Sequence, residues 1–124
     1  MPLTVKAMME AANAVVKRVD TDFAQQVMEQ GGLLLDVRDA VELQQTGRAI
    51  GAHHIPRSML EFRADDSLQS HDPELRKDRP IVLYCAAGGR AALAGKLLKD
   101  MGYEQVYNLG GLPDWINGGG EVSS

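Results

Sequence analysis

The chain has 124 residues, of which 44% are hydrophobic and 24% are charged, and these values favour a single globular domain. The formal net charge of −4 argues against a general nucleic-acid binder, because such proteins normally carry a basic face. The single cysteine, Cys85, excludes an internal disulfide and a zinc site made of four cysteines.

The N-terminal segment predicts a helix over residues 4–18, with Thr4 as its cap. Its apolar residues form one stripe at helical spacing, which comprises Val5, Met8, Met9, Ala12, Val15 and Val16. The stripe packs either on the rest of the chain or on a second copy, so we expect a monomer or a homodimer. The sequence thus predicts an N-terminal helical extension (1–17), a main domain (18–118) and a flexible tail (119–124).

Strands and helices are predicted to alternate along the main domain. In chain order we expect a helix over 23–29 capped by Thr21 and Asp22, a strand over 33–35, a helical turn over 40–45, a loop over 47–51, strands over 52–55 and 81–84, a helix over 91–101, a strand over 106–109, and a helix over 113–116 with Trp115 in the core. This alternation predicts a three-layer α/β/α fold with a central, mostly parallel sheet of about five short strands.

The segment from Cys85 to Arg90 lies between the clearest strand and the strongest helix. Cys85 ends the strand, and four small residues, Ala86, Ala87, Gly88 and Gly89, separate it from Arg90. In open α/β sheets ligands bind at the carboxyl ends of the strands, where main-chain N–H groups and a helix N-terminus hold anions. Such donors stabilise a thiolate, which is the nucleophilic form of cysteine. The segment therefore predicts Cys85 as a nucleophile.

Two questions about this loop stay open on the sequence alone. Cys85 could instead be a small buried apolar residue at the end of a strand, although the glycines and Arg90 that follow favour a functional loop. Arg90 could bind an oxyanion such as thiosulfate, or it could hold the loop in place through backbone carbonyls.

The sequence resembles the rhodanese family over about residues 18–118. Four segments carry the resemblance: Leu35-Asp36-Val37-Arg38-Asp39 with Glu42, Gly47 through Pro56, Tyr103 through Gly111 with Trp115, and the six-residue loop Cys85–Arg90 with cysteine first, glycine fourth and arginine last. Each segment is a weak or moderate signal alone, and their shared order and spacing make the match specific.

The resemblance implies a rhodanese-like fold and a sulfurtransferase in which Cys85 accepts sulfur as a persulfide. The amides of residues 86–90 would cradle the sulfur, and Asp36 and Arg38 would stabilise neighbouring loops. The donor would be thiosulfate or a protein or small-molecule persulfide, and the acceptor cyanide or a thiol, with no further cofactor. Ala86 and Ala87 depart from well-known thiosulfate-using members of the family, which have basic residues at these positions.

Two other functions remain as alternatives. Cysteine phosphatases of the cell-cycle type and arsenate reductases use a similar loop, but with five residues between cysteine and arginine where this chain has four. A non-catalytic module that carries, relays or senses sulfur would keep the same cysteine, and it would receive sulfur from a relay protein.

Metal binding and membrane insertion are not expected. His53 and His54 are adjacent in a predicted strand, so their side chains point to opposite faces and do not easily share one ion. The sequence shows no apolar run of the ~20 residues that span a membrane and no N-terminal secretory signal, so a cytoplasmic location is expected.

Overall fold

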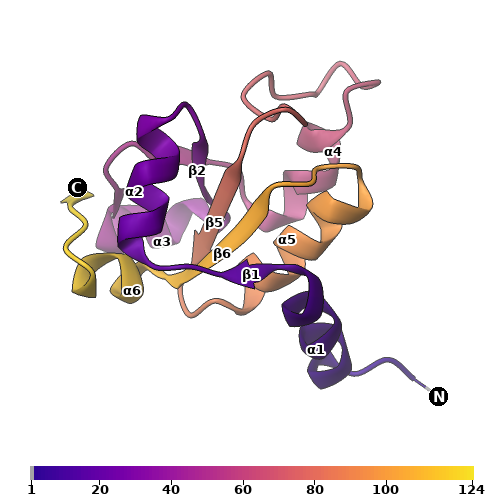
Figure 1. Ribbon diagram of the computed structural model, residues 1–124, viewed down its shortest axis with the longest axis horizontal. Coiled ribbons are helices and arrows are strands. Elements are labelled where there is room, and N and C mark those ends of the chain that lie inside the picture. The colour runs from indigo at the N-terminus through magenta and orange to yellow at the C-terminus, as the bar shows by residue number, and fades with distance from the viewer. Residues whose placement is uncertain (1) are drawn as a thin grey trace.

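A computed structural model describes residues 2–124 and shows a three-layer α/β/α arrangement around a five-stranded parallel sheet, as predicted (Figure 1). The strands are β1 (Lys17–Arg18), β2 (Leu33–Asp36), β4 (His53–His54), β5 (Ile81–Cys85) and β6 (Val106–Gly111), in the spatial order β1-β6-β5-β2-β4. Each neighbouring pair is parallel. The carboxyl ends of these strands therefore meet at one edge of the sheet.

The two central strands are buried along their whole length. Every residue of β2 and β5 is buried, and the register pairs Leu33 with Ile81 and Asp36 with Tyr84. Continuous apolar runs are typical of parallel strands because helices cover both faces of the sheet. Asp36 is a charged residue at the buried end of β2, and its carboxylate therefore needs buried partners.

Helices cover the two faces of the sheet separately (Figure 1). One face packs against α2 (Thr21–Glu29) and α6 (Leu112–Asn117), and the other packs against α4 (Leu60–Ala64) and α5 (Gly89–Asp100). The connecting segments include α3 (Ala40–Thr46) and the 3-10 turn η1 (Arg57–Met59). Trp115 of α6 is buried, as predicted for a core residue.

The N-terminal helix α1 (Val5–Val15) projects from one end of the molecule and packs along α5 (Figure 1). Thr4 caps it as predicted, because its side-chain oxygen accepts a hydrogen bond from the Ala7 amide at 3.1 Å. Only part of the apolar stripe is covered: Ala12 and Val16 are buried, whereas Val5 and Val15 are exposed.

The N-terminus of α2 differs from the prediction. Asp20 caps this helix, since its Oδ1 accepts a hydrogen bond from the Phe23 amide at 2.9 Å. The Thr21 hydroxyl donates instead to the carbonyl oxygens of Asp114 and Trp115, both at 3.1 Å. Thr21 therefore joins α2 to α6.

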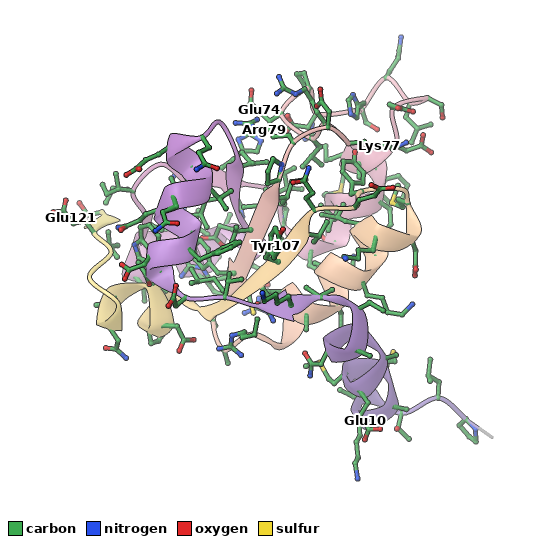
Figure 2. All side chains as sticks on the ribbon, in the orientation of Figure 1. Glu10, Glu74, Lys77, Arg79, Tyr107 and Glu121 are labelled. Atoms are coloured by element: carbon green, nitrogen blue, oxygen red, sulfur yellow. The ribbon has the colours of Figure 1, made fainter. Side chains whose placement is uncertain are left out.

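The segments predicted as a loop over 47–51 and a flexible tail over 119–124 meet in a small second sheet. Here β3 (Arg48–Ala49) pairs in antiparallel fashion with β7 (Val122–Ser123). The Trp115 indole N–H donates to the Glu121 carbonyl at 2.8 Å, and Figure 2 shows Glu121 at this end of the molecule. Pairing satisfies backbone groups that a free tail would leave to water.

The long connection before β5 is tied to the sheet by an arginine. Arg79 donates to the Gly31 carbonyl at 2.7 Å and forms an ion pair with Glu74 at 2.9 Å, and Figure 2 shows these two side chains together. These contacts join the end of the connection to the turn that precedes β2, so they help to set the start of β5.

Candidate active site

Cys85 ends β5, and its thiol lies under the loop that leads into α5. The Sγ atom accepts hydrogen bonds from the main-chain N–H groups of Gly88 at 3.0 Å and of Ala91 at 3.4 Å. Cys85 is 1% exposed, whereas Ala86 and Ala87 next to it are exposed. Two amides therefore point at the sulfur, and they favour negative charge there.

The loop depends on glycine at two contacts. Gly88 has a φ of +105°, and a Cβ at this position would lie 3.3 Å from the Gly110 Cα. Gly111 packs so closely on the loop that a Cβ there would collide with the Ala86 carbonyl. A side chain at either position would push the loop away from the sulfur or strain it.

Arg90 connects the loop to α3. Its guanidinium donates to both carboxylate oxygens of Glu42, Nη1 to Oε1 at 2.6 Å and Nη2 to Oε2 at 2.9 Å. The hydrogen bond from Arg90 lowers the pKa of Glu42 to about 2, and Oε1 also accepts from the Asp39 amide at 3.0 Å. The two groups therefore form a bidentate ion pair at neutral pH.

Asp36 and Arg38 form a buried ion pair beside the loop. Arg38 Nη2 donates to Asp36 Oδ2 at 2.7 Å and to the Gly47 carbonyl at 2.6 Å, and Nη1 donates to the Thr46 hydroxyl at 2.7 Å. Through these contacts Arg38 joins the end of β2 to the end of α3.

The hydroxyl of Tyr84 completes this network. It donates to Asp36 Oδ2 at 2.6 Å and accepts from the Ala49 amide at 3.0 Å. Burial first, and then the hydrogen bond to the Asp36 carboxylate, raises the pKa of Tyr84, so its hydroxyl stays protonated. Tyr84, the residue directly before Cys85, is thus fixed by hydrogen bonds to Asp36 and to the Ala49 amide.

Asn108 of β6 and Arg18 of β1 hold the opposite side of the loop. The Asn108 side chain donates to the Gly88 carbonyl at 3.2 Å and accepts from the Gly110 amide at 2.8 Å. Arg18 lies beside the same glycines, where it donates to the Leu109 carbonyl at 3.2 Å and forms an ion pair with Asp114 at 3.3 Å.

A pocket of about 330 Å³ opens next to the loop, between α3 and α6. Residues from these helices and from both neighbouring loops line it: Arg38, Glu42, Gln45, Thr46, Ala86, Leu112, Pro113 and Ile116. The pocket therefore adjoins the Cys85 loop through Ala86.

The structure brings together most of the residues that the sequence singles out. The cysteine, the loop and the Asp36–Arg38 pair lie at the same edge of the sheet, and Gly88 supplies one of the predicted loop amides. The second amide that reaches the sulfur comes from Ala91, one residue beyond the predicted cradle of residues 86–90.

Sequence reasoning missed three contacts around this loop. The position of Glu42, three residues after Asp39, indicates a helix-capping carboxylate, but its pairing with Arg90 across 48 positions had no local signal. Asn108 and Arg18 carried no local signal, because their partners lie on the neighbouring strand or its loop.

The two adjacent histidines have separate hydrogen-bond partners. His53 Nε2 lies 2.6 Å from Asp72 Oδ2, and His54 Nε2 lies 2.7 Å from the Arg38 carbonyl oxygen. Among residues 2–124, no group of three or more histidine, cysteine, aspartate or glutamate side chains is arranged to hold a metal ion. Within the same residues, no helix is both long and apolar enough to cross a membrane.

Comparison with known proteins identifies the family. The model of the rhodanese-like domain matches residues 19–117. The chain is 35% identical over 92 residues to the uncharacterized protein YqhL of Bacillus subtilis, a match that covers 73% of this chain and 64% of YqhL, just under two thirds. It is 32% identical over 100 residues to the thiosulfate sulfurtransferase GlpE of Pseudomonas savastanoi, covering 80% of this chain and 86% of GlpE.

A solved structure is similar to this one over nearly the whole chain. RPA3614 of Rhodopseudomonas palustris, described as a protein of unknown function and a possible tyrosine phosphatase, superposes with a TM-score of 0.86. It is 34% identical, and the match covers 99% of both chains, so it includes the region of α1. Because the family model spans most of the sequence and the fold agrees, this chain belongs to the rhodanese-like domain family.

Proposed function

We propose that the protein is a sulfurtransferase that carries a sulfane sulfur atom on Cys85. The observation that supports this most directly is the contact of the thiol with the amides of Gly88 and Ala91 at the start of α5. These donors suit a sulfur that is negatively charged before, during and after transfer. The sulfurtransferase activity of GlpE, a relative at 32% identity, agrees with the proposal.

The reaction divides into two transfers. The Cys85 thiolate attacks the outer sulfur of a donor, an S–S bond forms on Sγ, and the donor's own sulfur–sulfur bond breaks. The leaving group departs with the electron pair, as sulfite from thiosulfate or as a thiolate from an organic persulfide. An acceptor thiolate or cyanide then attacks the outer sulfur of the Cys85 persulfide and restores the thiolate.

The residues around the loop would hold this geometry without reacting. Arg90 is bonded to Glu42, and Asp36 is bonded to Arg38 and Tyr84, so each of these charges already has a protein partner. We assign Asp36 and Arg38 to positioning the end of β2 and the neighbouring loop. A thiolate needs no general base, so the transfer requires no histidine beside Cys85.

The test is whether Cys85 gains and loses one sulfur atom. The protein is incubated with thiosulfate or with an organic persulfide, and intact mass is measured before and after addition of cyanide. We expect the mass to rise by one sulfur and to return as thiocyanate forms, and we expect Cys85→Ser to show neither change while it keeps its circular dichroism spectrum. Transfer that persists in Cys85→Ser would refute the mechanism, and loading without turnover would favour a carrier over an enzyme.

Phosphatase activity is the second candidate, because RPA3614 is described as a possible tyrosine phosphatase. Two features of this chain argue against it. Only four residues separate Cys85 from Arg90, which makes the loop small for a tetrahedral phosphate, and the Arg90 guanidinium is bonded to Glu42 rather than free for phosphate oxygens. Turnover of p-nitrophenyl phosphate, measured against thiosulfate plus cyanide, separates the two activities.

A further inference from the structure

The pocket between α3 and α6 has an apolar wall directly beside the reactive loop. Ala86, Leu112, Pro113 and Ile116 form this wall. The volume of about 330 Å³ lies at the lower end of the range for small-molecule sites, which are lined mainly by apolar side chains. Ile116 is 49% exposed, so part of a large apolar side chain faces the solvent here.

The pocket touches one end of the Cys85 loop and contacts the residue that binds its other end. Ala86, the residue directly after Cys85, lines the pocket at one end. Glu42, which binds the guanidinium of Arg90 at the other end, also lines it. A group bound in the pocket therefore lies next to the place where sulfur is transferred.

The charges around the loop are already neutralised. Each of three arginines beside the loop or the pocket is paired with a carboxylate: Arg90 with Glu42 at 2.6 Å, Arg38 with Asp36 at 2.7 Å, and Arg18 with Asp114 at 3.3 Å. A multiply charged anion such as thiosulfate would have to compete with a carboxylate for each of these guanidinium groups. An uncharged group avoids that competition.

We propose that this pocket binds the apolar, uncharged substituent of a small organic thiol or persulfide. The inference rests on the proposed function and names the substrate class for the same site. An organic persulfide R–S–S⁻ gives its outer sulfur to the Cys85 thiolate and leaves as R–S⁻. An acceptor thiolate R–S⁻ runs the same step in reverse, so one subsite serves donor and acceptor.

The experiment compares acceptor thiols in single turnovers. Cys85 is loaded with inorganic polysulfide, excess reagent is removed, and loss of the added sulfur is followed by mass after mixing with benzyl mercaptan, 2-mercaptoethanol or 2-mercaptoethanesulfonate. Rates are expressed per thiolate concentration. Benzyl mercaptan should react at least about 10-fold faster than 2-mercaptoethanol, since a single methylene in an apolar pocket is worth a factor of 10 or more. The sulfonate should react no faster than 2-mercaptoethanol.

Two matched variants locate the preference. Ile116→Ser should reduce the benzyl mercaptan to 2-mercaptoethanol ratio to within about 3-fold of one, because it removes much of the apolar wall. Ile50→Ser is the control: Ile50 is 48% exposed, does not line this pocket, and should leave the ratio unchanged.

Failures of the two proposals are distinguishable. If the wild-type ratio is below about 10-fold, or if both variants change it equally, the pocket is not the subsite, and transfer to cyanide still supports the sulfurtransferase. If Cys85 neither loads nor passes sulfur to cyanide, both proposals are wrong.

Discussion

Substituting Glu42 with glutamine tests the ion pair with Arg90 that joins the Cys85 loop to α3. Glutamine keeps an oxygen that accepts from the Asp39 amide, so the change mainly removes the charge that Arg90 binds. A carboxyl whose pKa is lowered from 4.5 to about 2 gains at most about 3 kcal/mol in the folded state. The Glu42 side chain is 28% exposed and that of Arg90 is 36% exposed, so solvent screening reduces the expected loss to about 1–2 kcal/mol.

The loss of unfolding free energy in Glu42→Gln should decrease as the pH is lowered. Because the folded-state pKa is lowered, the stabilisation is complete above the unfolded pKa, near 4.5, and disappears as the pH falls through about 2. The stability difference between wild type and Glu42→Gln should therefore be largest at neutral pH and fall to about half or less by pH 3.

Urea unfolding followed by circular dichroism at several pH values measures this difference. Glu61→Gln is the control, since Glu61 makes a single, local i,i+4 contact with Arg57, its side chain is 46% exposed, and the loss should be no more than about 0.5 kcal/mol. A difference for Glu42→Gln that is absent at neutral pH, or equally large at pH 3, would refute this account of the loop.

Two further changes probe the residues next to the thiol. Tyr84→Phe should lower the free energy of unfolding by about 2–3 kcal/mol in urea titrations, because it removes a donor from the Asp36 carboxylate and leaves the buried Ala49 amide unpaired. Tyr103→Phe is the control: its hydroxyl donates only to carbonyls, so its loss should cost about 1 kcal/mol. An equal loss of stability in the two variants would contradict this account. Gly88→Ala should slow persulfide formation at least tenfold in mass-based loading assays, since φ is +105° at this position. Gly89→Ala should load with sulfur at the wild-type rate, because a Cβ there meets nothing within 4 Å. Equal loading rates in the two alanine variants would mean that the Gly88 conformation does not matter.

The parts of the fold that the sequence predicts well are those with a strong local pattern. The apolar runs at 33–35 and 81–84 become β2 and β5, which are buried on both faces of the sheet. The loop after Cys85 was predictable because Gly88 and Gly89 permit a tight turn and a helix follows at once. Local chemistry was thus enough to predict a tight turn between Cys85 and a helix.

The missed features depend on contacts between distant residues. Two-residue strands such as β3 and β7 have no periodicity, and their pairing joins positions 75 residues apart. Asp20, Thr21 and Asp22 can all cap a helix by local rules, and the choice of Asp20 is made by α6, whose carbonyls take the Thr21 hydroxyl. Arg90 and Glu42 meet across 48 positions in the same way.

The fluorescence of Trp115 reports on the packing of the C-terminal segment. Trp115 is the only tryptophan, and its indole is covered by the backbone of Gly120 and bonded to the Glu121 carbonyl. Detachment of residues 120–124 would expose the indole to solvent while the parallel sheet stays folded. Fluorescence emission should consequently shift to longer wavelength at a lower denaturant concentration than the far-ultraviolet signal changes, and the gap between the two curves measures how firmly the chain end is attached.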